Sequence, residues 1–152
     1  MHTINADLHC HSVVSDGTLT PEALASRAHA NGVQTWSLTD HDEVSGQERA
    51  KKAAEDLGMQ YISGVEISVT WCSKTVHIVG LGIDHTNTAL IAGLYQTRNG
   101  RTNRAKAIAA QLDQIGIKNA YEGALKFVGN PELVSRTHFA RFLIDSGVCK
   151  DT

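Results

Sequence analysis

Apolar stretches typical of strands alternate with stretches typical of helices over residues 3–62. The strand predictions cover residues 3–9, 33–38 and 60–62, and the helix predictions between them cover residues 21–30 and 45–57. This alternation is expected of a parallel sheet whose strands are connected by helices. Because the loops that carry functional groups lie at the carboxyl ends of such strands, polar residues there are the first candidates for a site.

The first predicted helix has signals at both of its ends. Thr20 is a candidate N-cap, and Pro21 suits the first helical position. We expect the helix to end near Ala30, because Asn31-Gly32 supplies a stop.

The pattern changes beyond a further strand predicted over residues 75–83. Three helical stretches then follow without a strand between them, over residues 88–115, 121–128 and 137–145. We expect the first of these helices to break near Asn99-Gly100. The sequence therefore predicts an α/β part over residues 1–85 and a helical insertion subdomain over residues 86–152.

Side chains with nitrogen or oxygen ligand atoms recur near the ends of the predicted strands. His9 and His11 are two residues apart, so both project to the same side of an extended segment. The six candidate ligands are His9, His11, Asp16, His41, Glu66 and His77. Imidazole nitrogen and carboxylate oxygen are ligands that Zn²⁺, Mn²⁺ and Fe²⁺ accept. This pattern predicts a metal-dependent hydrolase.

Single histidines and cysteines have simpler explanations than metal binding. His2, His29 and His85 fit a chain terminus, a helix end and a loop, and Cys10 is expected to point away from its histidine neighbours and pack. The six candidate ligands differ because they recur in five separate segments. His41 also lies between two aspartates, Asp40 and Asp42, either of which could orient its ring.

Composition excludes several classes of protein. The net charge of −2 and the isoelectric point near 6.4 exclude a strongly basic nucleic-acid binder. No apolar run approaches the roughly 20 residues that cross a bilayer, and three cysteines without disulfide spacing favour reduced thiols. We therefore expect a cytoplasmic protein with no membrane partner.

Five motifs occur in an order that is similar to a known family. They are Asp7-Leu8-His9-Cys10-His11-Ser12, Ser15-Asp16-Gly17, Thr39-Asp40-His41-Asp42, Gly64-Val65-Glu66-Ile67 and His77-Ile78-Val79-Gly80-Leu81. Together they resemble the polymerase and histidinol phosphatase (PHP) superfamily, and most closely its TrpH/YciV-type branch of nucleotide phosphoesterases. The resemblance continues through Ser135-Arg136-Thr137-His138-Phe139-Ala140-Arg141.

The resemblance implies a fold and a set of metals. The fold would be a partial distorted (β/α)7 barrel with a helical insertion, binding two or three divalent ions that could be Mn, Zn, Fe or Mg. In the family pattern His9, His11 and Glu66 would serve one metal, Asp16 and His41 a second, and Glu66 with His77 a third. Clustered cations of this kind supply a bound hydroxide at neutral pH, which would act as the nucleophile.

The chain departs from the family pattern in its later motifs. A complete member continues with an Ala-His-Pro and a Ser-Asp-x-His segment, whereas the last histidine here is His138 and the sequence stops at Thr152. We therefore expect an amino-terminal portion that needs the carboxyl-terminal remainder of the barrel as a partner and is nearly inactive alone.

Two sets of basic residues are candidates for contacts with the substrate. Arg136 and His138 stand at the predicted start of a helix, where they could bind a phosphate or simply belong to a capped helix. Arg98, Arg101 and Arg104 recur at intervals of three, and a solvated helix face is the simpler alternative to a contact with a nucleotide backbone.

The function expected from the resemblance is hydrolysis of nucleotide phosphates. The substrate would be a 5′-nucleotide, a 3′,5′-bisphosphate nucleotide or the 5′ end of a short RNA. The alternatives are a phosphatase of the histidinol-phosphate type and a catalytically silent PHP module. Six intact candidate ligands argue against the silent module.

Overall fold

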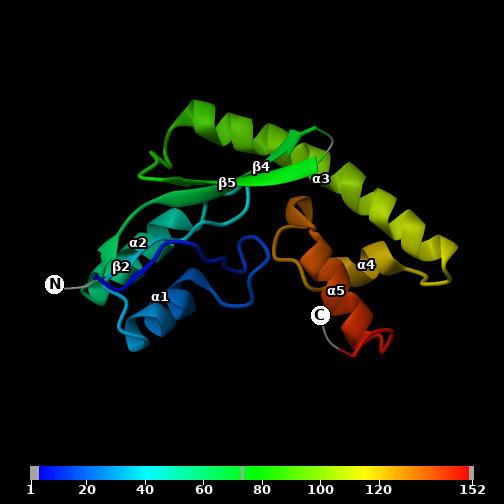
Figure 1. The fold of residues 1–152 in the computed structure, drawn as a ribbon, viewed down its shortest axis with the longest axis horizontal. Helices are drawn as coiled ribbons and strands as arrows, with labels where there is room; N and C mark the ends of the chain where they lie inside the picture. The colour runs from blue at the N-terminus through cyan, green and yellow to red at the C-terminus, as the bar shows by residue number, and fades with distance from the viewer. Residues whose placement is uncertain (1–3, 73, 151–152) are drawn as a thin grey trace. The chain divides into compact units, whose positions relative to one another are not determined.

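The computed structural model describes residues 4–72 and 74–150. It contains two compact units, Met1–Thr97 and Arg98–Thr152, and the boundary between them falls inside helix α3 (Thr88–Gln114). Figure 1 shows the elements in chain order. The sequence predicted the boundary after residue 85, just before α3 begins. In the structure the first turns of α3, up to Thr97, belong to the first unit instead.

A small parallel sheet begins the first unit. Its strands are β1 (Ala6–Asp7), β2 (Thr35–Trp36) and β3 (Gln60–Tyr61), in the order β1-β2-β3. Both strand pairs are parallel, as the alternation of the sequence predicted. The strands are shorter than expected, and Thr3, at the start of the first predicted strand, lies outside the described residues.

Two helices connect these strands. Helix α1 (Pro21–Ala30) has the predicted bounds, and the Thr20 side chain accepts a hydrogen bond from the Ala23 amide at 3.3 Å. Helix α2 (Gln47–Asp56) starts two residues later than the stretch predicted from residue 45. The capping chemistry of α1 was therefore readable from the sequence.

The core of this sheet combines large side chains with alanines. Trp36 and Leu38 are fully buried and lie in one cluster with Ala25 of α1 and Ala50 and Ala54 of α2. The small side chains let both helices approach the indole closely. Residues that follow β2 are thereby held at a fixed position.

A β-hairpin follows the parallel sheet and was not predicted as such. Strand β4 (Gly64–Trp71) pairs antiparallel with β5 (Lys74–Leu81), and Cys72 in the turn takes a positive φ of 47°. The register pairs Glu66 with Val79 and Ser68 with His77. Glu66 and His77 therefore lie inside strands of an antiparallel pair, and the expectation that both follow strand ends was wrong.

The hairpin is linked to the parallel sheet and to α3. A parallel bridge pairs His41, beyond β2, with Glu66. On the opposite face of β4, the fully buried Val65 clusters with Val44 and with Leu94 of α3. This packing fixes the position of the strand that carries Glu66.

Helix α3 is continuous, so the predicted break at Asn99-Gly100 is wrong. A glycine inside a helix costs about 1 kcal/mol relative to alanine, which packing can offset. Leu94 before the predicted break and Ala105 after it are both buried, each in the core cluster of its own unit.

The second unit is helical. Helices α4 (Ala120–Leu125) and α5 (Arg136–Asp145) lie near the predicted ranges, and a 3₁₀ turn, Pro131–Leu133, precedes α5. Gly123 of α4 lies against the Phe142 ring, where no Cβ would fit. Along the described part of the chain, no helix combines the length and apolar character that crossing a membrane requires.

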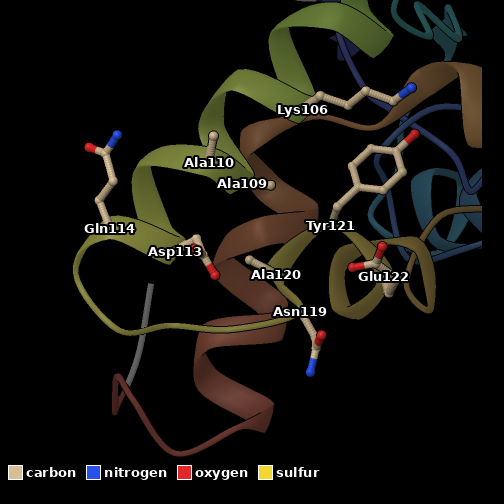
Figure 2. Close-up of a pocket in the computed structure, with 9 residues that line it drawn as sticks. All are labelled: Lys106, Ala109, Ala110, Asp113, Gln114, Asn119, Ala120, Tyr121 and Glu122. Atoms are coloured by element: carbon tan, nitrogen blue, oxygen red, sulfur yellow. The ribbon is translucent and has the colours of Figure 1, made fainter.

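An open pocket of about 670 Å³ lies between the end of α3 and the start of α4 (Figure 2). Lys106 and Asp113 line it from α3, and Tyr121 and Glu122 line it from α4. None of these four side chains is buried, so the pocket does not have the enclosed polar groups typical of a built site.

The environment of Cys10 predicts its reactivity. Burial and the nearby Asp7 carboxylate raise the pKa of the Cys10 thiol to about 12, and its Sγ donates to the Ser37 carbonyl at 3.4 Å. Because the thiolate is the reactive form, iodoacetamide at pH 8 should modify Cys10 at least about tenfold more slowly than the exposed Cys72 and Cys149. Peptide mass spectrometry over time measures the three rates, with the urea-unfolded chain as the control. Equal rates in the folded chain would contradict this environment.

Candidate metal centre

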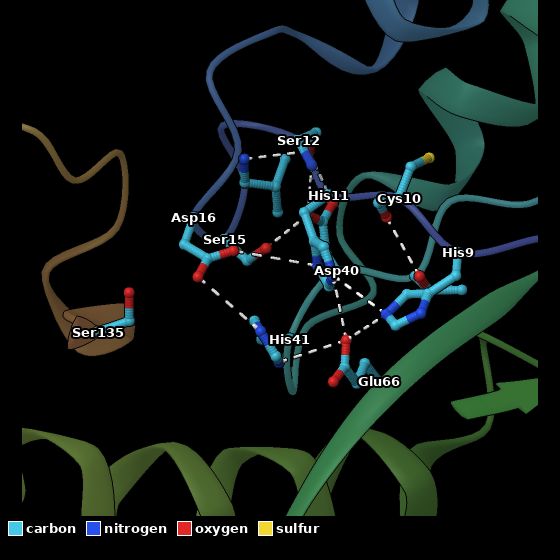
Figure 3. Close-up of polar contacts among 12 residues, drawn as sticks. His9, Cys10, His11, Ser12, Ser15, Asp16, Asp40, His41, Glu66 and Ser135 are labelled. Carbon is cyan, nitrogen blue, oxygen red and sulfur yellow. Dashed lines mark hydrogen bonds and ion pairs between the residues drawn. The ribbon is translucent and has the colours of Figure 1, made fainter. Parts of the chain in front are cut away.

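The six predicted ligands come together in the first unit. His9, His11 and Asp16 stand in the segment after β1, and His41 follows β2. Glu66 belongs to β4 and His77 to β5. Figure 3 shows the side chains of all but His77 converging from these segments.

The Glu66 carboxylate is at the centre of the cluster. Its Oε2 lies 2.6 Å from His9 Nε2 and 3.0 Å from His11 Nε2, and its Oε1 lies 3.3 Å from His77 Nδ1. The residue is only 5% exposed. Alternation along the hairpin explains this contact, because Glu66 and His77 lie on the same face of the strand pair.

His41 lies between Glu66 and Asp16. Its Nδ1 is 3.8 Å from Glu66 Oε2, and its Nε2 is 3.8 Å from Asp16 Oδ2. The ring stacks on His11, with 4.5 Å between the centroids and 19° between the planes. One imidazole therefore faces both carboxylates of the cluster.

These side chains form three overlapping groups that could each hold a metal ion. The groups are His9–His11–Glu66, His11–Asp16–His41 and His41–Glu66–His77, and within each group the ligand atoms lie within 4.8 Å of one another. His11 Nδ1 is buried and, among the described residues, has no hydrogen-bond partner. A set of imidazole nitrogens and carboxylate oxygens at this spacing fits a first-row divalent ion.

The electrostatics favour an ionised Glu66. Burial by itself raises the pKa of this carboxyl group, but the hydrogen bond with His9 and the nearby His41 and His11 outweigh it and lower the pKa below its usual value. The carboxylate is therefore in the charged form that binds metal ions.

The Asp40 carboxylate has partners that the sequence did not suggest. It is buried and accepts hydrogen bonds from Ser12 and Ser15, on the segment that carries His11 and Asp16. Burial raises the pKa of Asp40, and the three hydrogen bonds oppose that shift. The roles of Ser12 and Ser15 were missed because their partner lies 25 to 28 positions away in the sequence.

Asp42 connects the His41 segment to β4. It takes a positive φ of 50°, and its amide donates to the Glu66 carbonyl at 2.8 Å. Its Oδ1 accepts from the Ser68 amide at 2.7 Å. The backbone that follows His41 is thereby attached to the strand that carries Glu66.

The structure places the predicted substrate residues in the second unit. His138 is buried, and its Nδ1 accepts a hydrogen bond from the Ser135 amide at 3.0 Å, which is the geometry of a helix cap. Arg136 is exposed. The phosphate-binding role of both residues stays a prediction, and the cap involves only Nδ1 of the His138 ring.

Other polar residues have roles outside the cluster. Arg98 and Arg101 are buried, so the alternative of a solvated helix face is wrong for these two; Arg98 Nε lies 3.5 Å from Glu132 Oε2. His85 Nε2 lies 2.6 Å from Glu48 Oε1 on α2. His85 thus fits the structural class in which the sequence placed it.

The fold and the cluster define a class: an α/β protein with a candidate multinuclear metal centre. The PHP domain model matches residues 7–126, which is most of the chain and includes all six predicted ligands. The chain belongs to the PHP domain family.

Curated relatives have named activities on nucleotides and RNA. The chain is 50% identical over 147 residues to a 3′,5′-nucleoside bisphosphate phosphatase of Chromobacterium violaceum, covering 97% of this chain and 52% of the relative. It is 45% identical over 141 residues to a 5′-3′ exoribonuclease of Haemophilus influenzae, covering 93% and 51%. The chain therefore spans about half the length of the curated relatives it matches.

A solved structure supports the same fold. An amidohydrolase from Chromobacterium violaceum, determined with bound sulfate and without metal, matches with a TM-score of 0.93 at 50% identity. The match covers 97% of this chain and 52% of that one. The mixed α/β arrangement described above is thus the arrangement of a PHP-type protein.

The overlap of the three groups predicts an order of effects on metal binding. Glu66→Ala removes a ligand from two groups and His77→Ala from one, so Glu66→Ala should lower the bound metal more. Affinity for Mn²⁺ or Zn²⁺ should fall at least about tenfold in Glu66→Ala, since even outer partners of a metal site are worth about that much. Calorimetric titration of the purified chain measures both variants.

His29→Ala is the matched control for this comparison. His29 lies in the last turn of α1, is exposed and belongs to none of the three groups. Its substitution should leave metal affinity unchanged. Equal, small losses in Glu66→Ala and His29→Ala would contradict the assignment of Glu66.

Proposed function

We propose that this chain forms the amino-terminal part of a divalent-metal-dependent phosphoesterase that hydrolyses nucleotide phosphates. The observation that carries the proposal is the convergence of four imidazoles and two carboxylates into three overlapping groups around Glu66. The substrate class is a 5′-nucleotide or 3′,5′-bisphosphate nucleotide, with short RNA attacked from its 5′ end as the extended form of the same chemistry.

The chemistry of the cluster suits this reaction. Divalent ions bound there would lower the pKa of water to near neutral and neutralise phosphate oxygens. The protein supplies the imidazoles and carboxylates that hold the ions, and Glu66 offers one oxygen to each of two sides of the cluster. The nitrogen-rich ligand set favours Zn, Mn or Fe over Mg.

Relatives support the choice of substrate. Two of them, at 50% and 45% identity, are named for a nucleoside bisphosphate and for RNA. The solved amidohydrolase at 50% identity holds sulfate, a tetrahedral oxyanion with the shape of a phosphate group. All three belong to chains about twice as long as the match, so the activity is proposed for the protein of which this sequence is a part.

The proposal includes a partner segment. Each group offers three ligands, whereas structural and catalytic sites of first-row ions use four or more, water included. We propose that further ligands come from the carboxyl-terminal remainder of a (β/α)7 barrel, which would also pair with the edge strands β1 and β5.

A cytoplasmic location is part of the same proposal, and the three cysteines, which form no disulfide, favour it.

A substrate panel tests the proposed activity. The chain alone should turn over substrate at most weakly, and a longer protein with the Ala-His-Pro and Ser-Asp-x-His segments should hydrolyse nucleotide phosphates in the presence of Mn²⁺. The panel contains adenosine 5′-phosphate, adenosine 3′,5′-bisphosphate, short 5′-phosphorylated RNA and histidinol phosphate, with phosphate release as the readout.

Each result of this panel has a defined meaning. Preference for histidinol phosphate would indicate that the substrate is a small phosphomonoester and not a nucleotide. No turnover of any compound by a longer protein loaded with metal would indicate a catalytically silent module. Equal specific activity of the short and long proteins would contradict the need for a partner segment.

We also propose that Arg136 binds the substrate phosphate at the start of α5, where helix amides favour anions. Arg136→Ala should raise KM for the nucleotide at least about tenfold, the loss expected for a charged hydrogen bond, and leave metal content unchanged. The exposed Lys126→Ala, from the same unit, is the matched control. Wild-type kinetics in Arg136→Ala would leave this arginine without a role in binding.

A further inference from the structure

One buried carboxylate of the first unit belongs to none of the three ligand groups. Asp40 is 1% exposed, and both of its oxygens accept hydrogen bonds. Oδ1 accepts from the Ser12 amide at 2.7 Å and from Ser15 Oγ at 2.6 Å, while Oδ2 accepts from Ser12 Oγ at 2.7 Å. A buried carboxyl group with three donors holds two segments together. Its oxygens lose these bonds if the segment of Asp40 moves relative to the segment of Ser12 and Ser15.

The donors belong to the segment between two candidate ligands. Ser12 and Ser15 lie between His11 and Asp16 in the sequence, and both are buried. Figure 3 shows their bonds to Asp40 beside His11 and Asp16. The Asp40 side chain therefore holds the segment that presents one nitrogen and one oxygen of the group His11–Asp16–His41.

The backbone of Asp40 reaches the remaining ligands. His41 is the next residue, and the Asp40 carbonyl accepts the Glu66 amide at 3.2 Å. Asp40 is thus connected to the backbone segments that carry four of the six candidate ligands, which are His11, Asp16, His41 and Glu66.

The segment also has backbone hydrogen bonds of its own. The Ser15 and Gly17 amides donate to the Ser12 carbonyl at 3.1 and 2.9 Å. A Cβ on Gly17 would collide with the His11 backbone, so glycine permits this tight turn. The bonds to Asp40 add a connection between this turn and the backbone that carries His41 and meets Glu66.

We propose that Asp40 is a positioning residue of the metal centre: through Ser12 and Ser15 it sets the distances from His11 and Asp16 to His41, without itself binding metal. This role rests on the proposed function only in that the cluster must bind a divalent ion. A mispositioned ligand weakens a site because the ion requires all donors at once, and outer partners are typically worth about 10–100-fold in affinity.

Two serines that differ in their partners provide the experiment. Ser15→Ala removes one bond to Asp40, whereas Ser37→Ala removes an equally buried hydroxyl that, in the part of the chain the structure describes, makes no hydrogen bond. Asp40→Asn is a second variant, nearly isosteric with the native side chain. All are made in the same chain, and thermal unfolding confirms that each is folded at the temperature used.

Co²⁺ is the probe, because its visible absorption reports both the occupancy and the geometry of the ligands. Ser15→Ala and Asp40→Asn should raise the Kd for Co²⁺ at least about tenfold and change the shape of the spectrum, and Ser37→Ala should stay within about twofold of wild type. A second readout needs no metal. Amide hydrogen exchange of Ser12 should quicken at least about tenfold in Asp40→Asn and stay unchanged in Ser37→Ala.

Each outcome decides the proposal. A drop in thermal stability of Ser15→Ala and Asp40→Asn with unchanged Co²⁺ affinity and spectrum would overturn the positioning role and leave the proposed function standing. Equal effects of Ser15→Ala and Ser37→Ala would overturn the positioning role as well, because the loss of any buried serine hydroxyl would then have the same effect on metal binding. Failure of the wild-type chain to bind Co²⁺ or Mn²⁺ at all would overturn the positioning role, and the same failure in a longer protein with the Ala-His-Pro and Ser-Asp-x-His segments would overturn the proposed function.

Discussion

The burial of one carboxylate among histidine rings is the constraint on which this structure depends. Glu66 is nearly inaccessible, and removing its charge from water is costly unless hydrogen bonds and cations compensate. The ring of His9 supplies a hydrogen bond at 2.6 Å, and His11 lies 3.0 Å away. The nitrogens of these two rings are also only 3.2 Å apart, a spacing at which two lone pairs repel unless a proton or an ion lies between them. The rings and the carboxylate are thus arranged around a position that a proton or a cation can occupy.

The scaffold makes this costly arrangement possible by burying apolar groups next to it. Val65 precedes Glu66 and points to the opposite face of β4, where it packs with Val44 and Leu94. Trp36 and Leu38 similarly anchor the strand that leads to His41. Glu66 and His41 are therefore one and three residues from a side chain whose burial holds the backbone in place.

Local signals in the sequence were enough to predict most of the helices and to select the candidate ligands, but not how distant segments meet. Thr20 and Pro21 marked the start of α1 correctly, because capping involves residues adjacent in the chain. The candidate ligands were selected because chemistry of one type recurs in five segments. The hairpin was missed because its turn uses Cys72 at positive φ instead of the glycine or asparagine that usually indicates such a turn.

Interactions over long sequence distances account for the remaining differences. The bonds between Asp40 and the two serines join positions more than 20 residues apart, and no local pattern reveals them. Asn99-Gly100 looked like a helix break because propensity was judged without the packing on either side of it. Arg98 looked solvated because helix periodicity alone does not show which faces are covered.

The pairing register of the β4–β5 hairpin has a consequence for how the protein folds. Side chains alternate along a strand, so sliding β5 by one residue would direct Val76 or Ile78 toward Glu66 and turn His77 to the other face. Both of these apolar side chains are substantially exposed in the observed register, at 41% and 52%, so their burial does little to select it. An ion held jointly by Glu66 and His77 would bind only the observed alignment. Metal binding would then stabilise the observed register relative to shifted registers. A hairpin whose alignment is weakly specified by packing would thereby adopt one alignment.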